Sequence, residues 1–122
     1  MSERGSVSIL VAAALAALLV IAMGSADVVR VLTTAAKAQT AADAAALAAA
    51  QTMAIPEEGV APADLARTYA ARNGGALQTC ECEPDSFEAI VTVRMPVGPL
   101  FLSGDDRAVT ASARAIVDLP TL

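Results

Sequence analysis

The chain has 122 residues, which is the length of one domain and leaves room for only one small core beside a membrane-length segment. Its net charge of −5 and its eight scattered basic residues argue against nucleic acid as a partner, because phosphate binding needs clustered Lys and Arg. The chain contains no histidine, the commonest general base and metal ligand. We therefore expect no enzyme, with no catalytic residues, no metal, no cofactor and no small-molecule substrate.

The first long element is an apolar helix that follows a short polar leader, residues 1–5. Residues 6–26 carry no charge, and at about 1.5 Å per residue they extend roughly 30 Å, the thickness of a bilayer core. We expect these residues to form the transmembrane half of one long helix. Within this half, pairs such as Ala13 with Ala17 follow the small-xxx-small spacing that lets helices approach closely in lipid.

Two processing sites are compatible with this amino-terminal segment. In a pilin-type leader, Gly5 ends the leader and a prepilin peptidase cuts before Ser6, which leaves the apolar segment on the mature protein. In a secretory signal, the cut falls between Ala26 and Asp27 and releases the rest of the chain. The apolar run is longer than a usual signal core, which favours a retained anchor.

Residues 27–54 are predicted to continue the helix outside the membrane as an Ala-rich half, and Pro56 ends it. Asp27, Arg30, Thr34 and Lys37 fall on one side of this half, which we expect to be polar. The opposite stripe is apolar at helical spacing, and we expect it to be the packing surface. Its members are Val28, Val31, Leu32, Ala35, Ala42, Ala46, Ala49 and Met53.

Residues 55–122 are predicted to form a small α+β domain. A short helix is expected at about 62–73, because Pro62 suits a first helical turn and Gly74 follows its end. Tyr69 is expected to point inward from this helix. Strands are expected at about 77–82, 87–95 and 108–117, where apolar residues alternate with polar ones, and Phe87 is placed on the inner face of the second.

The expected fold class is therefore α+β and pilin-like. A long amino-terminal helix, transmembrane in its first half, packs on a three-stranded antiparallel sheet, with a short second helix beside it. The turn between the first two strands is predicted at 83–86, and a longer loop at 96–106 precedes the third. Such a sheet needs a cover for its apolar face, and the Ala-rich helix is the candidate.

Cys80 and Cys82 are the two cysteines, and they lie two positions apart on a predicted strand. A disulfide between them would need local distortion of the strand. A metal site would lack further ligands, and a redox pair would lack the usual Cys-x-x-Cys spacing. Outside the cytoplasm, a local disulfide or a pair that awaits a partner is favoured.

Three segments together resemble a known family: Arg4-Gly5-Ser6-Val7, then Asp27-Val28 with Arg30, and then the run from Ala38 to Ala48, Ala-Gln-Thr-Ala-Ala-Asp-Ala-Ala-Ala-Leu-Ala. They are similar to the TadE/TadG-like proteins of actinobacterial tight-adherence pilus systems. The resemblance covers about residues 4–50, and beyond them it extends only to the general layout.

The resemblance implies a minor pilin or pseudopilin held in the cytoplasmic membrane as a single-pass protein, with its carboxy-terminal domain outside the cytoplasm. Implied partners are other pilin-like subunits and the pilus assembly platform. A cut before Ser6 would add prepilin peptidase as a partner, but it would place Leu10 where cleaved pilins usually carry Glu. An uncleaved anchor is equally compatible. The alternative function is a secreted small binding module released by cleavage after Ala26.

Overall fold

The computed structural model describes residues 3–104 and 106–120, so Met1 and Ser2 of the expected leader lie outside the described residues. Helix α1 runs over Glu3–Ala54 and helix α2 over Pro62–Arg72. Strands β1 (Ala76–Glu81), β2 (Glu88–Pro96) and β3 (Ala108–Ile116) follow, with a short 3-10 turn, η1 (Pro84–Ser86), between the first two. These elements confirm the predicted α+β fold class.

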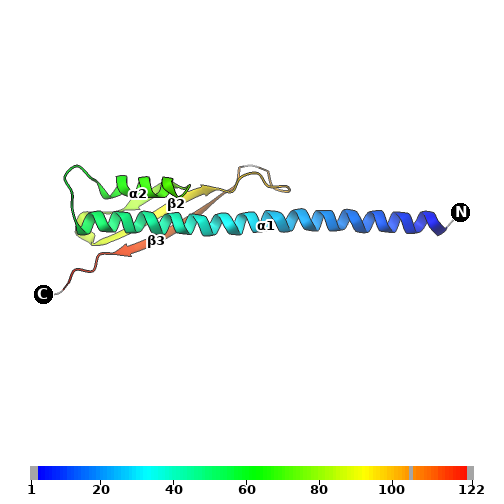
Figure 1. The fold of residues 1–122 in the computed structure, drawn as a ribbon, viewed down its shortest axis with the longest axis horizontal. Helices are drawn as coiled ribbons and strands as arrows, with labels where there is room; N and C mark the ends of the chain where they lie inside the picture. Colours follow the sequence, from blue (N-terminus) through cyan, green and yellow to red (C-terminus); the bar gives the residue numbers. More distant parts are fainter. Residues whose placement is uncertain (1–2, 105, 121–122) are drawn as a thin grey trace.

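Helix α1 is one continuous rod, because Ala and Leu favour the helix and no proline precedes Pro56. The sheet and α2 both lie along its second half, while its first half projects alone toward the amino terminus (Figure 1). We call residues 5–26 the free half of α1 and residues 27–54 its domain half.

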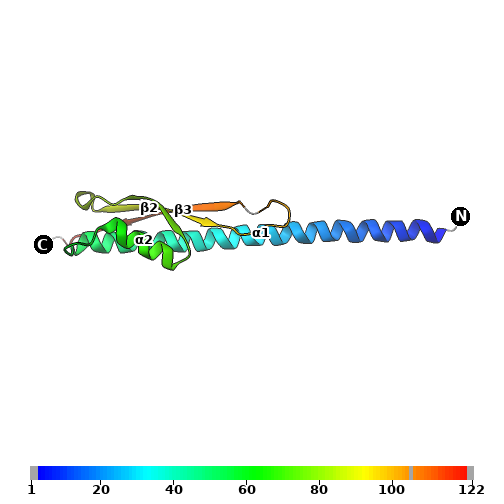
Figure 2. The same ribbon diagram turned by 90° about the horizontal axis from the view of Figure 1, so that it is seen from above.

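The three strands form an antiparallel meander in the order β1-β2-β3. The inner positions of β2 are buried, and the register places Val91 opposite Ala113 and Val93 opposite Ala111. The outer face is polar, and there Thr92 and Ser112 share a hydrogen bond of 2.9 Å. This alternation leaves one apolar face of the sheet, which the domain half of α1 covers (Figure 2).

Alanine dominates the core between these layers. The two largest fully buried side chains are Val91 and Val93, and almost all their buried neighbours on the helices are small. Small side chains bring the helix axes and the sheet close together, so each additional methyl group would have to displace a neighbour. The buried helical residues are Ala38, Ala41, Ala42, Ala45, Ala46, Ala48, Ala49, Ala50 and Met53 of α1 and Ala66 and Ala70 of α2.

Two aromatic residues do not lie where the sequence pattern placed them. Tyr69 was predicted to point inward, but it is 36% exposed and lies beneath the Arg72 guanidinium, because Ala66 and Ala70 form the buried face of α2. Phe87 was predicted on the inner face of the second strand. It instead precedes β2 in the left-handed backbone region, with a φ of 53°, and its side chain is exposed.

The end of α2 shows how the chain turns from helix to strand. The backbone N–H of Asn73 donates to Ala70, and that of Gly75 donates to the same carbonyl at 2.9 Å. Gly74 takes a positive φ of 81°, which glycine adopts without strain. Gly75 then passes so close to α1 and β2 that a Cβ atom there would overlap Val93 and lie 3.3 Å from the Cβ of Ala41.

Candidate functional site

The free half of α1 is a long apolar surface. Nearly all of its side chains are exposed, and none of its most apolar stretch is buried among the residues that the structure describes. The hydroxyl of Ser25 donates to the carbonyl of Ile21 at 2.8 Å, so this polar side chain is satisfied within the helix itself. Among the described residues, α1 is the one helix that is long and apolar enough to cross a membrane.

A loop from the far end of the chain contacts α1 where the free half ends. This junction loop, residues 97–104, connects β2 toward β3 and is narrowed by a bridge between Leu100 and Gly104. Its tip lies on α1 at two points. Leu102 is 3.6 Å from the position that a Cβ on Gly24 would take, and Asp27 binds the loop backbone one turn later.

Asp27 is the polar centre of this contact. Asp27 is 8% exposed as a residue, and its carboxylate accepts hydrogen bonds from the backbone N–H groups of Phe101, at 2.8 Å, and Leu102, at 2.9 Å. Hydrogen bonds to an ionised acceptor are stronger than those between neutral groups. The two bonds therefore hold the loop tip and also compensate the carboxylate for its burial.

Arg30, one turn further along α1, binds the same loop. Its guanidinium donates to the carbonyl of Pro99, and its Cζ lies 5.3 Å from the centre of the Phe101 ring. The sequence placed Asp27 and Arg30 on the polar side of the helix, opposite the apolar stripe. Asp27 is nevertheless buried beneath the loop, whereas Arg30 remains exposed while it binds the loop.

The predicted packing stripe divides into three groups. Ala42, Ala46, Ala49 and Met53 are buried against the rest of the domain. Val31 and Ala35 are half-buried, and Val28 and Leu32 are exposed. The reason is that the sheet covers only the later turns of α1, so the large aliphatic residues at the start of the stripe are only partly covered by the described part of the chain.

The predicted processing residues all lie within α1. Gly5 and Ser6 are in its first turns, and Ala26 and Asp27 are helical residues in its middle. A cut after Ala26 would sever a continuous helix beside the residue that binds the junction loop.

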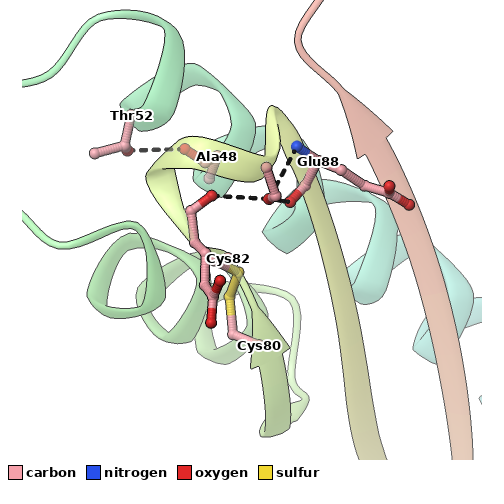
Figure 3. The surroundings of a disulfide bond; sticks show 7 residues. Ala48, Thr52, Cys80, Cys82 and Glu88 are labelled. Atoms are coloured by element: carbon pink, nitrogen blue, oxygen red, sulfur yellow. Dashed lines mark hydrogen bonds between the residues drawn. A yellow bond between two sulfur atoms is a disulfide. The ribbon is translucent and has the colours of Figure 1, made fainter.

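Cys80 and Cys82 form a disulfide in the structure, with Cα atoms 5.3 Å apart. Strand β1 ends at Glu81, so the bond closes the chain at the strand end, next to the turn that leads to Glu88 (Figure 3). Both cysteines pack at the edge of the apolar core. Within residues 3–104 and 106–120, no three His, Cys, Asp or Glu side chains gather as metal ligands would.

Sequence reasoning missed the Asp27 site because its partners lie 74 and 75 residues away in a loop of irregular backbone. A signal was nevertheless present. Asp27 is the first charged residue after a long uncharged run, and it directly follows the small residues Gly24, Ser25 and Ala26. Small residues on a helix leave space for another segment to contact it closely, and a carboxylate beside such a space can accept from that segment's backbone.

Comparison with known proteins finds a family model that matches this helix. Residues 5–52 match the Tad family, described as Flp pilus-assembly TadE/G-like. No curated protein and no solved structure matches the chain. The match covers nearly all of α1 and stops before α2 and the sheet, and the actinobacterial origin that the resemblance suggested stays a prediction. Helix α1 of this chain is therefore similar to the TadE/G-like segment of Flp pilus-assembly proteins.

Proposed function

We propose that this protein is a membrane-anchored, non-enzymatic, pilin-like component of a tight-adherence pilus or a related secretion apparatus. The free half of α1 crosses the cytoplasmic membrane once, and the small α+β domain lies outside the cytoplasm. The anchored helix packs against other pilin-like subunits and against the assembly platform.

One observation carries this proposal. Helix α1 is divided into a half that packs in a domain and a half whose large apolar side chains are exposed within the part of the chain that the structure describes. Large aliphatic residues such as Ile9 and Leu10, 71% and 67% exposed, would not remain in water on a helix of this length. Lipid or neighbouring helices must cover them, and the family match over the same residues supports a pilus as the setting.

The exposed start of the packing stripe supports contact with other subunits. Val28 and Leu32 are 57% and 63% exposed on the domain half, directly beyond the free half. They extend the apolar surface of α1 past Asp27 without contributing to the core of their own domain. We infer that these two residues, rather than the buried alanines, are available to helices of neighbouring subunits.

The anchor is tested by placing charge on the free half. In the double variant Leu15→Arg with Leu19→Arg, each arginine near the middle of a span is expected to cost about 2.5–3.5 kcal/mol of insertion free energy. Both leucines are more than half exposed, so the folded domain should not change. We expect the variant to leave the membrane fraction and to form no surface filaments.

The matched control is Leu47→Arg with Gln51→Arg, which places the same two charges four residues apart on the domain half of the same helix. Leu47 is 58% exposed and Gln51 is exposed, so this control should stay in the membrane fraction. Equal membrane retention of the two double variants would contradict the proposed anchor.

A further inference from the structure

The tip of the junction loop presents two neighbouring apolar side chains to the exterior. Phe101 is 59% exposed and Leu102 is 58% exposed, although the backbone that carries them is firmly held. Asp27 accepts from both of their N–H groups, and the Leu100–Gly104 bridge closes the loop behind them. A firmly held loop tip that leaves two large apolar side chains more than half exposed indicates a contact that lies outside the chain.

The position of this tip along α1 indicates what it meets. Leu102 lies against Gly24 and Asp27 binds the loop, so the tip is level with the last turn of the uncharged segment 6–26. The loop is the part of the domain closest to the free half (Figure 1). If residues 6–26 cross a bilayer, the loop tip reaches the boundary between acyl chains and headgroups at the end of that span.

The polar groups around the loop tip are arranged in a way that suits the boundary between acyl chains and headgroups. The carboxylate of Asp27 is paired with two N–H groups, so it does not face lipid as an unpaired charge. Arg30 lies over the ring of Phe101, and Arg107 lines the same side of the loop as Leu100. Both arginines are exposed, and at this depth their guanidinium groups can bind lipid phosphates.

We propose that the junction loop is an interfacial membrane contact, in which Phe101 and Leu102 insert into the headgroup and acyl boundary of the bilayer that the free half crosses. The contact rests on the proposed membrane anchor and adds a second point of attachment. With α1 and the loop both fixed to the bilayer, the domain is held in one orientation on the membrane surface. A helix alone would leave the domain free to rotate and tilt.

The absence of tryptophan from the chain makes this contact directly measurable. The Phe101→Trp variant of the full chain carries a single tryptophan, which preserves an aromatic ring for Arg30. The protein is placed in vesicles of phosphatidylcholine with phosphatidylglycerol as the minor component. Part of the phosphatidylcholine is brominated either near the carbonyl end of the acyl chains or near their terminal methyl groups. We expect shallow bromines to at least halve the tryptophan emission and deep bromines to reduce it less.

Phe87→Trp is the matched control. Phe87 is also an exposed phenylalanine at one end of β2, and the length of that strand, roughly 30 Å at about 3.4 Å per residue, separates it from the junction loop. Its tryptophan should be quenched by neither lipid. Leu102→Trp serves as a second probe of the tip, in case a change at Phe101 disturbs the loop.

A third single-tryptophan variant, Leu15→Trp, separates this inference from the anchor itself. Deep bromines should quench it strongly. If they do, but Phe101→Trp and Leu102→Trp emit as Phe87→Trp does, the interfacial contact is wrong and the anchor stands. If Leu15→Trp is not quenched, the anchor and the interfacial contact both fail. Emission from the tip that shifts to the blue with protein concentration, without quenching by lipid, would show that a second copy covers the loop and would overturn the proposal.

Discussion

Asp27 lies at the boundary between the free half of α1, which is exposed and apolar, and the domain half, which packs against the sheet. It follows the last uncharged turn of the helix, and its carboxylate binds a loop that the chain reaches only after both strands β1 and β2. Neither of the two N–H groups that it binds has a partner in regular secondary structure. The residue therefore lies where the domain begins along the rod.

Replacing Asp27 with Ala should release the junction loop. Two loop N–H groups would lose a charged acceptor, which we expect to cost about 1–3 kcal/mol of unfolding free energy. Amide hydrogen exchange of the full chain in detergent micelles should speed up at Phe101 and Leu102. The control is Asp43→Ala, on the same helix, because the Asp43 carboxylate is exposed and accepts only from the neighbouring Gln39 side chain. Unchanged exchange in the Asp27→Ala variant would contradict this role.

Gly75 is the residue at which the absence of a side chain matters most. A methyl group there would meet Val93 and Ala41 in the centre of the core, so Gly75→Ala should destabilise the domain by about 1–3 kcal/mol. Thermal unfolding measures this difference. Gly24→Ala provides the contrast, because its methyl group would only touch Leu102 at 3.6 Å and it lies within a helix, where Ala is favoured over Gly. Equal melting temperatures for the two variants would contradict the close packing at Gly75.

The single-residue errors of the sequence interpretation share a physical cause. Tyr69 is the largest apolar group on α2, and burial of large groups is the usual rule, yet Ala66 and Ala70 form the buried face of this helix. Asp27 has the pattern of a solvated charge when only its helix is considered. In each case the burial of the residue depends on neighbours from another part of the chain. Helical periodicity describes only residues of the same helix.

At the scale of elements, periodicity predicted far more. The fold class, the three strands in antiparallel order and both helices are confirmed, and the ends of α2 and the strands lie within about a residue of the predicted positions. Alternation with a period of two and an apolar stripe with a period near four are properties of the sequence itself. The start of β2 differs because Phe87 takes a left-handed backbone conformation, which no hydrophobic pattern encodes.

The close packing of α1 against the sheet can be tested by substitution. Ala46→Leu adds bulk at a position that is 1% exposed between α1 and the sheet, and we expect it to lower the unfolding free energy by about 1–3 kcal/mol. Ala36→Leu on the exposed side of the same helix should change it by less than about 0.5 kcal/mol. Chemical denaturation in detergent compares the two. Similar denaturation midpoints for the two variants would indicate that α1 and the sheet can move apart to accommodate the larger side chain.

At the scale of the whole molecule, the chain is a helical rod with a domain on one half and an uncovered apolar surface on the other (Figures 1 and 2). The family match covers most of α1 but neither α2 nor the sheet, since it ends at residue 52. The sequence could predict a membrane-length segment from composition alone. The residues proposed to contact neighbouring subunits could not be predicted from the sequence. The reason is that one end of the apolar stripe packs in the chain's own core, whereas the other end is exposed.

Retention of residues 6–26 as a membrane anchor can be tested by determining the amino-terminal sequence and the intact mass of the protein recovered from cells. We expect a chain that retains residues 6–26 and is found in the membrane fraction, whether or not a leader was cut before Ser6. A soluble protein whose first residue is Asp27 would rule out the anchor and would favour a released binding module.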